Sequence, residues 1–164
     1  MEQAPLGFPM EEDGVPLINA RATFYFYGTY LPASLGPSSF YIIANRDANG
    51  EILNGNDTYR LTIAGDAPAR DFWSIIAYSA LTKGFIRDAK TVGFSSREME
   101  SLNVNDDGSV DVYFAPEAPK GWESNWIPTQ PGRRFFLIFR FYGPEKGVYD
   151  GSYELNDIER IDRP

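Results

Sequence analysis

Two long apolar stretches, rich in aromatic and β-branched residues, constrain the fold of this 164-residue chain most strongly. They are DFWSIIAYSALT at residues 71–82 and RRFFLIFRFYGP at residues 133–144. Side chains of these types pack well on a pleated surface and favour strands over helices. Neither stretch reaches the roughly 18 apolar residues that a membrane-spanning helix needs. We therefore expect two long, buried β-strands inside a water-facing domain.

Shorter stretches of strand character fill much of the remaining chain. SFYIIAN (39–45), NDTYRLTIAG (56–65) and SVDVYFAP (109–116) are expected strands, and the second and third alternate apolar with polar residues. GFIRD and TVGFSS are read as short edge strands or loops, and GSYELNDIERID as a last strand. The pattern predicts an all-β fold, a jelly-roll-like β-sandwich. It leaves room for one or two short helices, near the N-terminus or at residues 96–101.

The expected domain organisation is an N-terminal arm at residues 1–19 followed by one β-sandwich domain at residues 20–164. The arm is rich in Pro, Gly and acidic residues and shows little periodicity. ARATFYFYGTYL, at residues 20–31, is compatible with a strand or a short helix. Its aromatic side chains belong either to the core or to an exposed patch. Such a patch would support self-association, as a homo-oligomer, or docking of a further domain.

The chain contains neither cysteine nor histidine. This excludes disulfides, zinc–thiolate sites, iron–sulfur clusters and a cysteine nucleophile. It also excludes Ser-His-Asp triads and histidine-dependent zinc and iron sites within the chain. An enzyme of this sequence would depend on carboxylates, Tyr, Lys, Arg or Ser–Lys pairs, or on a metal bound by oxygen alone. No P-loop and no Ser-x-x-Lys motif is present, and no cofactor is expected.

The net charge of −8 and the pI of about 4.5 argue against partners that are themselves anionic. Nucleic acid and acidic membrane surfaces would be repelled, and no basic run compensates. MEQAPLGFPMEEDG at the N-terminus lacks the basic and apolar regions of a signal peptide. The chain as given is expected to be soluble and intracellular, or else a trimmed form without its targeting segment. The compartment stays open.

The stretch NVNDDGS raises the question of a calcium site. Oxygen-bearing side chains and then glycine fall at EF-hand positions 1, 3, 5 and 6, namely Asn103, Asn105, Asp107 and Gly108. Position 12, which should be a bidentate Glu, is Phe114. The same pattern recurs before Asn49-Gly50, and both copies lie between strand-like stretches. Asp-Gly and Asn-Gly are also the residues of tight hairpin turns, so two hairpins are favoured over metal sites, with Asp107-Gly108 expected at a hairpin tip.

Several motifs in the second half of the chain occur together in one known family. They read DFWS…Y, N.DGS.D.Y, ESNW.P, R.Y.P and DG.Y, and the most specific are Glu123–Trp126 with Pro128 and Arg140–Tyr142. Taken in order, they resemble the family called domain of unknown function 1214, over about residues 20–161. The resemblance implies a jelly-roll-like β domain. In typical relatives it follows a second β domain, absent here, and many relatives look secreted or periplasmic. The family implies no particular reaction.

The Pro- and Gly-rich loop at residues 115–132 is the first candidate binding site, because loops of this length often carry function. Trp122 and Trp126 would be stacking platforms, and Glu123 and Asn125 polar contacts, for a sugar or another flat polar ligand. Glu123 could also act as a general acid if a neighbouring aromatic ring raised its pKa. The alternative is structural: one Trp closes the end of the sandwich, and the polar side chains bond to the loop backbone.

Arg140 and Tyr142 are the second candidate pair. Arg140 interrupts the strand FFLIFRFY and shares its side with Tyr142 by strand parity. An inward-facing Arg needs a partner, which Asp71 or Glu123 would supply, or it would clamp a ligand carboxylate. Asp71 and Glu123 are also weak candidates for a catalytic acid pair.

Two classes of function therefore remain. The first is a binding or assembly module that recognises a small molecule, such as a carbohydrate-like ligand, or a protein partner. The second is a metal-free, carboxylate-dependent hydrolase or lyase acting on a glycan or an ester. The absence of histidine, the commonest acid–base residue of enzymes, favours the first.

Overall fold

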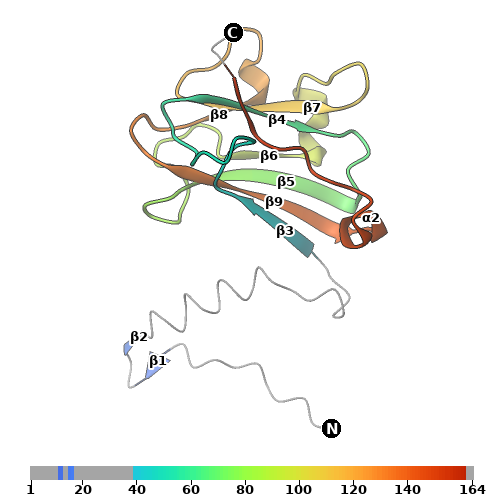
Figure 1. Cartoon of the computed structure of the whole chain (residues 1–164), viewed down its shortest axis with the longest axis horizontal. Helices are drawn as coiled ribbons and strands as arrows, with labels where there is room; N and C mark the ends of the chain where they lie inside the picture. Colours follow the sequence, from blue (N-terminus) through green and yellow to red (C-terminus); the bar gives the residue numbers. More distant parts are fainter. Residues whose placement is uncertain (1–10, 13–14, 17–38, 162–164) are drawn as a thin grey trace. The chain divides into compact units, whose positions relative to one another are not determined.

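The computed structural model describes residues 11–12, 15–16 and 39–161. The chain divides into two units, Met1–Pro37 and Ser38–Pro164, which are described separately (Figure 1). In the first unit the structure describes β1 (Glu11–Glu12) and β2 (Val15–Pro16), which pair antiparallel. The strand or helix expected at residues 20–31, and most of the arm expected at residues 1–19, lie outside the described residues.

The second unit is built from two four-stranded sheets that face each other (Figure 1). The first sheet has the order β3-β9-β5-β6 and is antiparallel throughout. Its strands are β3 (Ser39–Ala44), β5 (Ala69–Ser79), β6 (Gly93–Ser95) and β9 (Phe135–Pro144). The two long apolar stretches form β5 and β9, which pair along most of their length in the middle of this sheet. The prediction of two long strands is confirmed.

The second sheet has the order β10-β4-β7-β8. Its strands are β4 (Thr58–Ile63), β7 (Val110–Ala115), β8 (Trp126–Pro128) and β10 (Glu159–Ile161). β8 pairs with β7 in parallel, whereas the other pairs are antiparallel. The all-β sandwich is thus confirmed. The jelly-roll part of the prediction is not confirmed, because jelly rolls are antiparallel architectures and this sheet contains a parallel pair.

The hydrophobic core lies between the two sheets and is filled by alternate residues of each strand. The predicted alternation in β4 is confirmed, since Tyr59, Leu61 and Ile63 are each 1% exposed. β9 contributes four inward residues that are at most 2% exposed: Phe135, Leu137, Phe139 and Phe141. The ring of Trp73 on β5 stacks on Phe139 with 5.6 Å between centroids. The period of two in the sequence therefore translates directly into two packed inner faces.

The helices in the described part are short. The 3-10 helix η2 (Ser96–Ser101) forms where a short helix was expected, and the Glu98 carboxylate accepts the N–H of Ser95 at 2.8 Å at its start. A second 3-10 turn, η3 (Glu123–Asn125), precedes β8, and α2 (Lys146–Asp150) follows β9. None of the helices in the described residues is long and apolar enough to cross a membrane.

Candidate functional site

The stretch NVNDDGS forms a tight turn. The N–H of Gly108 donates to the Asn105 carbonyl at 2.9 Å, and Gly108 has φ of 82°, a conformation that suits glycine. Oδ1 of Asp107 accepts the backbone N–H (2.9 Å) and the hydroxyl (2.6 Å) of Ser109. These hydrogen bonds lower the pKa of the Asp107 carboxyl. The turn leads into β7, whose Phe114 is buried in the core, whereas residues 103–105 form no strand. The predicted turn is therefore present, but the prediction that Asp107-Gly108 lies at the tip of a hairpin is wrong, because β7 pairs with β4 and β8.

The second copy of the pattern, before Asn49-Gly50, is also a turn. The N–H of Gly50 donates to the Asp47 carbonyl at 2.9 Å. Oδ1 of Asp47 accepts the N–H groups of Asn49 and Glu51. In both copies the carboxylate that would face a metal ion is used to hold the turn.

Millimolar calcium is expected to leave the melting temperature of the protein unchanged, because the turn consumes the Asp107 ligand atom and the position-12 ligand is replaced by Phe114. In the described part of the chain, no group of three or more acidic residues is arranged to hold a metal. Thermal melts followed by circular dichroism, with calcium and with a chelator, measure this. A calcium-dependent rise in melting temperature would contradict the assignment of a turn.

Asn125, one of the predicted ligand contacts, is completely buried and fully hydrogen-bonded within the chain. Its Oδ1 accepts the N–H of Asn103 and the hydroxyl of Ser124, each at 2.8 Å. Its Nδ2 donates to the carbonyls of Asn103 (2.8 Å) and Asp111 (2.9 Å). Asn125 therefore fastens the loop before β8 to β7 and to the segment that follows η2.

The other predicted residues of this loop also bond to the loop itself or to β7. The indole N–H of Trp126 donates to the Ala115 carbonyl at 2.9 Å, and Trp122 packs against the ring of Tyr113 with centroids 5.2 Å apart. Glu123 is exposed and accepts the N–H of Gly121 at 3.1 Å. Backbone N–H groups, its own and that of Gly121, lower its pKa. A general acid would need a shift in the opposite direction.

Arg140 and Tyr142 lie on the outward face of the first sheet, away from the loop before β8. Nη2 of Arg140 donates to the Tyr78 hydroxyl at 2.7 Å, and its guanidinium lies 5.5 Å from the ring centroid of Tyr41. Nη1 of Arg140 is buried and has no hydrogen-bond partner in the part of the chain that the structure describes. Tyr142 stacks on Phe72 with centroids 4.1 Å apart. The partner of Arg140 is thus a tyrosine, where the sequence suggested a carboxylate.

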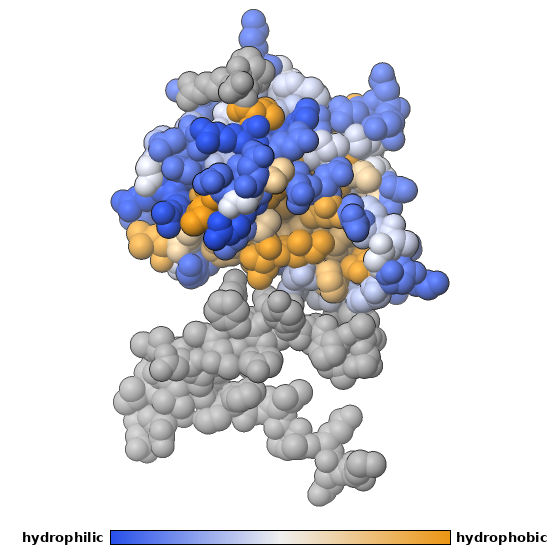
Figure 2. All heavy atoms as spheres, viewed as in Figure 1, coloured by the Kyte–Doolittle hydropathy of each residue, from blue (hydrophilic) through white to orange (hydrophobic). Residues whose placement is uncertain are grey.

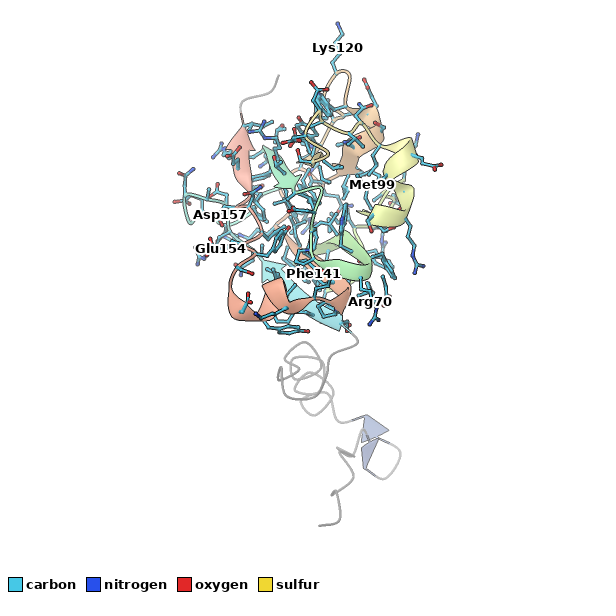
Figure 3. The ribbon with its side chains drawn as sticks, turned by 90° about the vertical axis from the view of Figure 1, so that its right-hand side faces the viewer. Arg70, Met99, Lys120, Phe141, Glu154 and Asp157 are labelled. Atoms are coloured by element: carbon cyan, nitrogen blue, oxygen red, sulfur yellow. The ribbon has the colours of Figure 1, made fainter. Side chains whose placement is uncertain are left out.

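Asp71, the other weak catalytic candidate, pairs with its neighbour. Both carboxylate oxygens accept from the guanidinium of Arg70 at 2.9 Å, and this lowers the pKa of Asp71. Figure 3 shows Arg70 at the surface of the domain. Asp71 belongs to β5, whereas Glu123 precedes β8 in the other sheet. The fold does not bring these two acids together.

A cleft of about 630 Å³ opens between the two sheets along the edge strand β3. The inward-facing residues of β3 are Phe40, Ile42 and Ala44, and all three are only half-buried. They pair with fully buried residues of β9 and pack against the edge of the hydrophobic core. The opposite edge strand, β10, is three residues long and does not close the gap. The floor of the cleft consists of core side chains: Leu61, Ile75, Leu137 and Phe139.

The second wall of the cleft is the irregular segment 151–158, which joins α2 to β10. The ring of Tyr153 packs edge-on against Phe141, and its buried hydroxyl has no hydrogen-bond partner within the described residues. Burial raises the pKa of Tyr153, and the charge of Asp66 adds to this. Glu154 and Asp157 are exposed at the rim on one side of the domain (Figure 3). Figure 2 shows hydrophobic side chains along the lower part of the domain, beneath a band of polar ones.

Residues 38–146 match the family described as "Protein of unknown function (DUF1214)". The chain belongs to the DUF1214 family. The matched region contains β3 and the cleft floor, whereas the wall at 151–158 lies outside it. No curated protein matches the sequence of this DUF1214 chain.

Two solved structures resemble this DUF1214 chain. The VPA0106 protein from Vibrio parahaemolyticus is 24% identical, with a TM-score of 0.67, over 88% of this chain and 35% of its own. An uncharacterised protein from Burkholderia cenocepacia is 20% identical, with a TM-score of 0.49, over 78% of this chain and 31% of its own. The chain thus spans about a third of the length of these proteins. The first comparison supports the fold and carries no information on function.

None of the site residues predicted from the sequence of this DUF1214 chain lines the cleft. The structure divides them between the loop before β8, the outward face of the first sheet and, for Asp71, the start of β5. The cleft residues of β3 were not identified because SFYIIA is apolar on both faces, and its period does not show which face turns inward. The C-terminal segment did contain a pattern that indicated a buried wall. Tyr153 and Leu155 alternate there with polar residues, although no strand forms.

Proposed function

We propose that this domain is a ligand-binding module whose cleft receives a small molecule with an apolar body. The observation that carries the proposal is the half-exposed inner face of β3, where Phe40, Ile42 and Ala44 border a cleft of about 630 Å³. This volume lies in the range of small-molecule sites, which are mostly apolar with a few polar groups. A ligand that covers the face would gain roughly 25 cal/mol for each Å² of apolar surface removed from water.

Carbohydrate-like recognition by the loop before β8 has less support. The polar groups of Asn125 and the indole N–H of Trp126 already bond within the chain, so a sugar would have to displace these contacts. The carboxylate-dependent hydrolase or lyase also has less support, because Glu123 and Asp71 lie in different parts of the fold and both have lowered pKa values. An apolar ligand in the cleft requires no such rearrangement.

An assembly role is the second candidate, and Arg140 is the observation that favours it. Its Nη1 is a buried donor on the outward face of β9, and no described residue accepts a hydrogen bond from it. A protein surface that offered a carbonyl or carboxylate oxygen to this nitrogen would remove the cost of leaving it unpaired. Tyr and Arg are also enriched in protein interfaces.

The cleft proposal is tested by titrating the protein with 1-decanol and recording amide chemical shifts by NMR. We expect the largest shift changes in β3 and in residues 153–158, with little change in residues 121–126. Ala44→Phe, which places a ring in the cleft, is expected to weaken binding about tenfold or more, because it removes the volume that the ligand occupies.

Ile43→Phe is the matched control, since Ile43 lies on the same strand but on the outward face and is 45% exposed. It should bind 1-decanol like the unmodified protein, as should Trp122→Ala. If 1-decanol causes no saturable shifts, or if Ala44→Phe and Ile43→Phe bind equally well, the cleft is not the binding site.

A further inference from the structure

We propose that the cleft selects apolar ligands that carry an amine over equally apolar ligands that carry a carboxylate. This inference rests on the ligand-binding role proposed above and adds the chemistry of the ligand head. Three features of the cleft support it: the charges at its rim, a buried hydroxyl in its wall and the absence of a free cation facing it among the described lining residues.

The rim is acidic on the side formed by segment 151–158. Glu154 and Asp157 are both exposed there, and in the described part of the chain neither carboxylate makes an ion pair. Figure 3 places the two residues at the same edge of the domain. Two like charges at one rim attract a cation and repel an anion at this opening, an effect that low-dielectric walls strengthen.

Arg46 is the positively charged side chain that lines the cleft. Its Nη1 donates to the Gly50 carbonyl at 2.7 Å, which holds the guanidinium toward the turn at residues 46–51. Its positive charge offsets one of the two rim carboxylates, so the summed formal charge of Arg46, Glu154 and Asp157 is negative. With a net charge of −8 on the whole chain, long-range attraction acts in the same direction.

The buried hydroxyl of Tyr153 provides a hydrogen-bonding group inside the wall. Among the described residues it has no hydrogen-bond partner, and the charge of Asp66 acts on it. An ammonium group has three donors and no acceptor, so it would donate to the rim carboxylates, and it would reach the phenol oxygen only after segment 151–158 shifts, because that oxygen is buried. A carboxylate head could accept from the phenol O–H, but it would meet Glu154 and Asp157 as like charges. The balance of contacts therefore favours the amine.

The test compares three ten-carbon ligands that differ only in the head: decylamine, 1-decanol and decanoate. Each is titrated below its micelle concentration, at pH 7 and low salt, by NMR or calorimetry. We expect decylamine to bind about tenfold more tightly than decanoate, with 1-decanol between them. Because the rim charges are exposed, the preference should shrink at high salt.

The variant Glu154→Gln/Asp157→Asn removes both rim charges. Its comparison with a control of equal net charge separates the effect of the rim from that of the whole protein. This double variant should reduce the preference for decylamine over decanoate from about tenfold to about twofold. Glu100→Gln/Asp106→Asn is the matched control, because both residues are exposed, neither lines the cleft, and the net charge changes by the same amount. This control should keep most of the preference for decylamine over decanoate.

The outcomes separate this inference from the proposed function. Equal binding of decylamine and decanoate, or tighter binding of decanoate, would overturn the charge selection and leave the binding role intact. An equal loss of preference in both double variants would also overturn it, since net charge alone would then be the cause. If none of the three ligands binds, both proposals fall.

Discussion

Asn125→Ala is expected to lower the free energy of unfolding by about 3–5 kcal/mol, among the largest effects that a single substitution has in a domain of this size. The side chain is 0% exposed and bonds to the N–H and carbonyl of Asn103 and to the carbonyl of Asp111. Alanine would leave these three backbone groups without this partner, and one of them, the Asp111 carbonyl, makes a fully buried bond. Each such group costs about 1–3 kcal/mol, and partial relaxation of the loop reduces the sum.

Urea denaturation followed by tryptophan fluorescence measures this change. Asn103→Ala is the matched control, because it removes a side-chain bond to the exposed Gly121 carbonyl and keeps both backbone bonds to Asn125. We expect the control to cost less than about 1 kcal/mol. A similar cost for both variants would show that the buried amide of Asn125 is not what fastens the loop.

Gly55→Ala is expected to destabilise the domain by about 2–4 kcal/mol through overpacking. A Cβ at this position would overlap the carbonyl oxygen of Gln130, which is backbone and cannot rotate away. Gly55 is also held on both sides, since its N–H donates to the Arg133 carbonyl at 2.8 Å and its own carbonyl accepts the Thr129 hydroxyl at 3.0 Å. Relief would require breaking these bonds.

Gly84→Ala is the control for this substitution, because the nearest atom to its new Cβ is the Thr82 hydroxyl oxygen at 3.8 Å. This variant should stay within about 0.5 kcal/mol of the unmodified protein in the same denaturation experiment. If the two alanine variants are equally stable, the contact between residues 55 and 130 is looser than the structure indicates.

The sequence predicted the strands whose patterns are strong, and missed elements that depend on distant partners. β4, β5 and β9 follow from alternation or from long apolar stretches. β8 was not predicted because WIP is three residues within a Pro- and Gly-rich loop, and its pairing with β7 is fixed by the loop's anchor, Asn125. α2 was missed for a similar reason, since five residues carry too little periodicity to identify a helix.

The candidate site was less predictable than the fold. The structural alternative for the loop before β8 was recognised from the sequence, because a long loop must satisfy its own polar groups. The cleft was not, because it arises from the unequal lengths of β3 and β10, edge strands of different sheets. A local pattern carries no information about which two strands will face each other across a sandwich. The partner of Arg140 was missed likewise, since Tyr78 meets it only through the pairing of β5 with β9.

The position of β9 between β3 and β5 has a consequence for how the chain reaches its native state. Both neighbours precede β9 in the sequence. In the second sheet, β4 likewise precedes its neighbour β10, which is the last strand of the chain to be made. During synthesis, β3 and β5 are therefore made before the strand that joins them, and the edges of β3 and β5 that pair with β9 have no strand partner until residues 135–144 emerge. Contacts between strands so far apart in sequence form slowly, because a long loop must close first. Folding of this sheet is thus tied to the last quarter of the chain, and shortened products ending before β9 would expose these strands to aggregation.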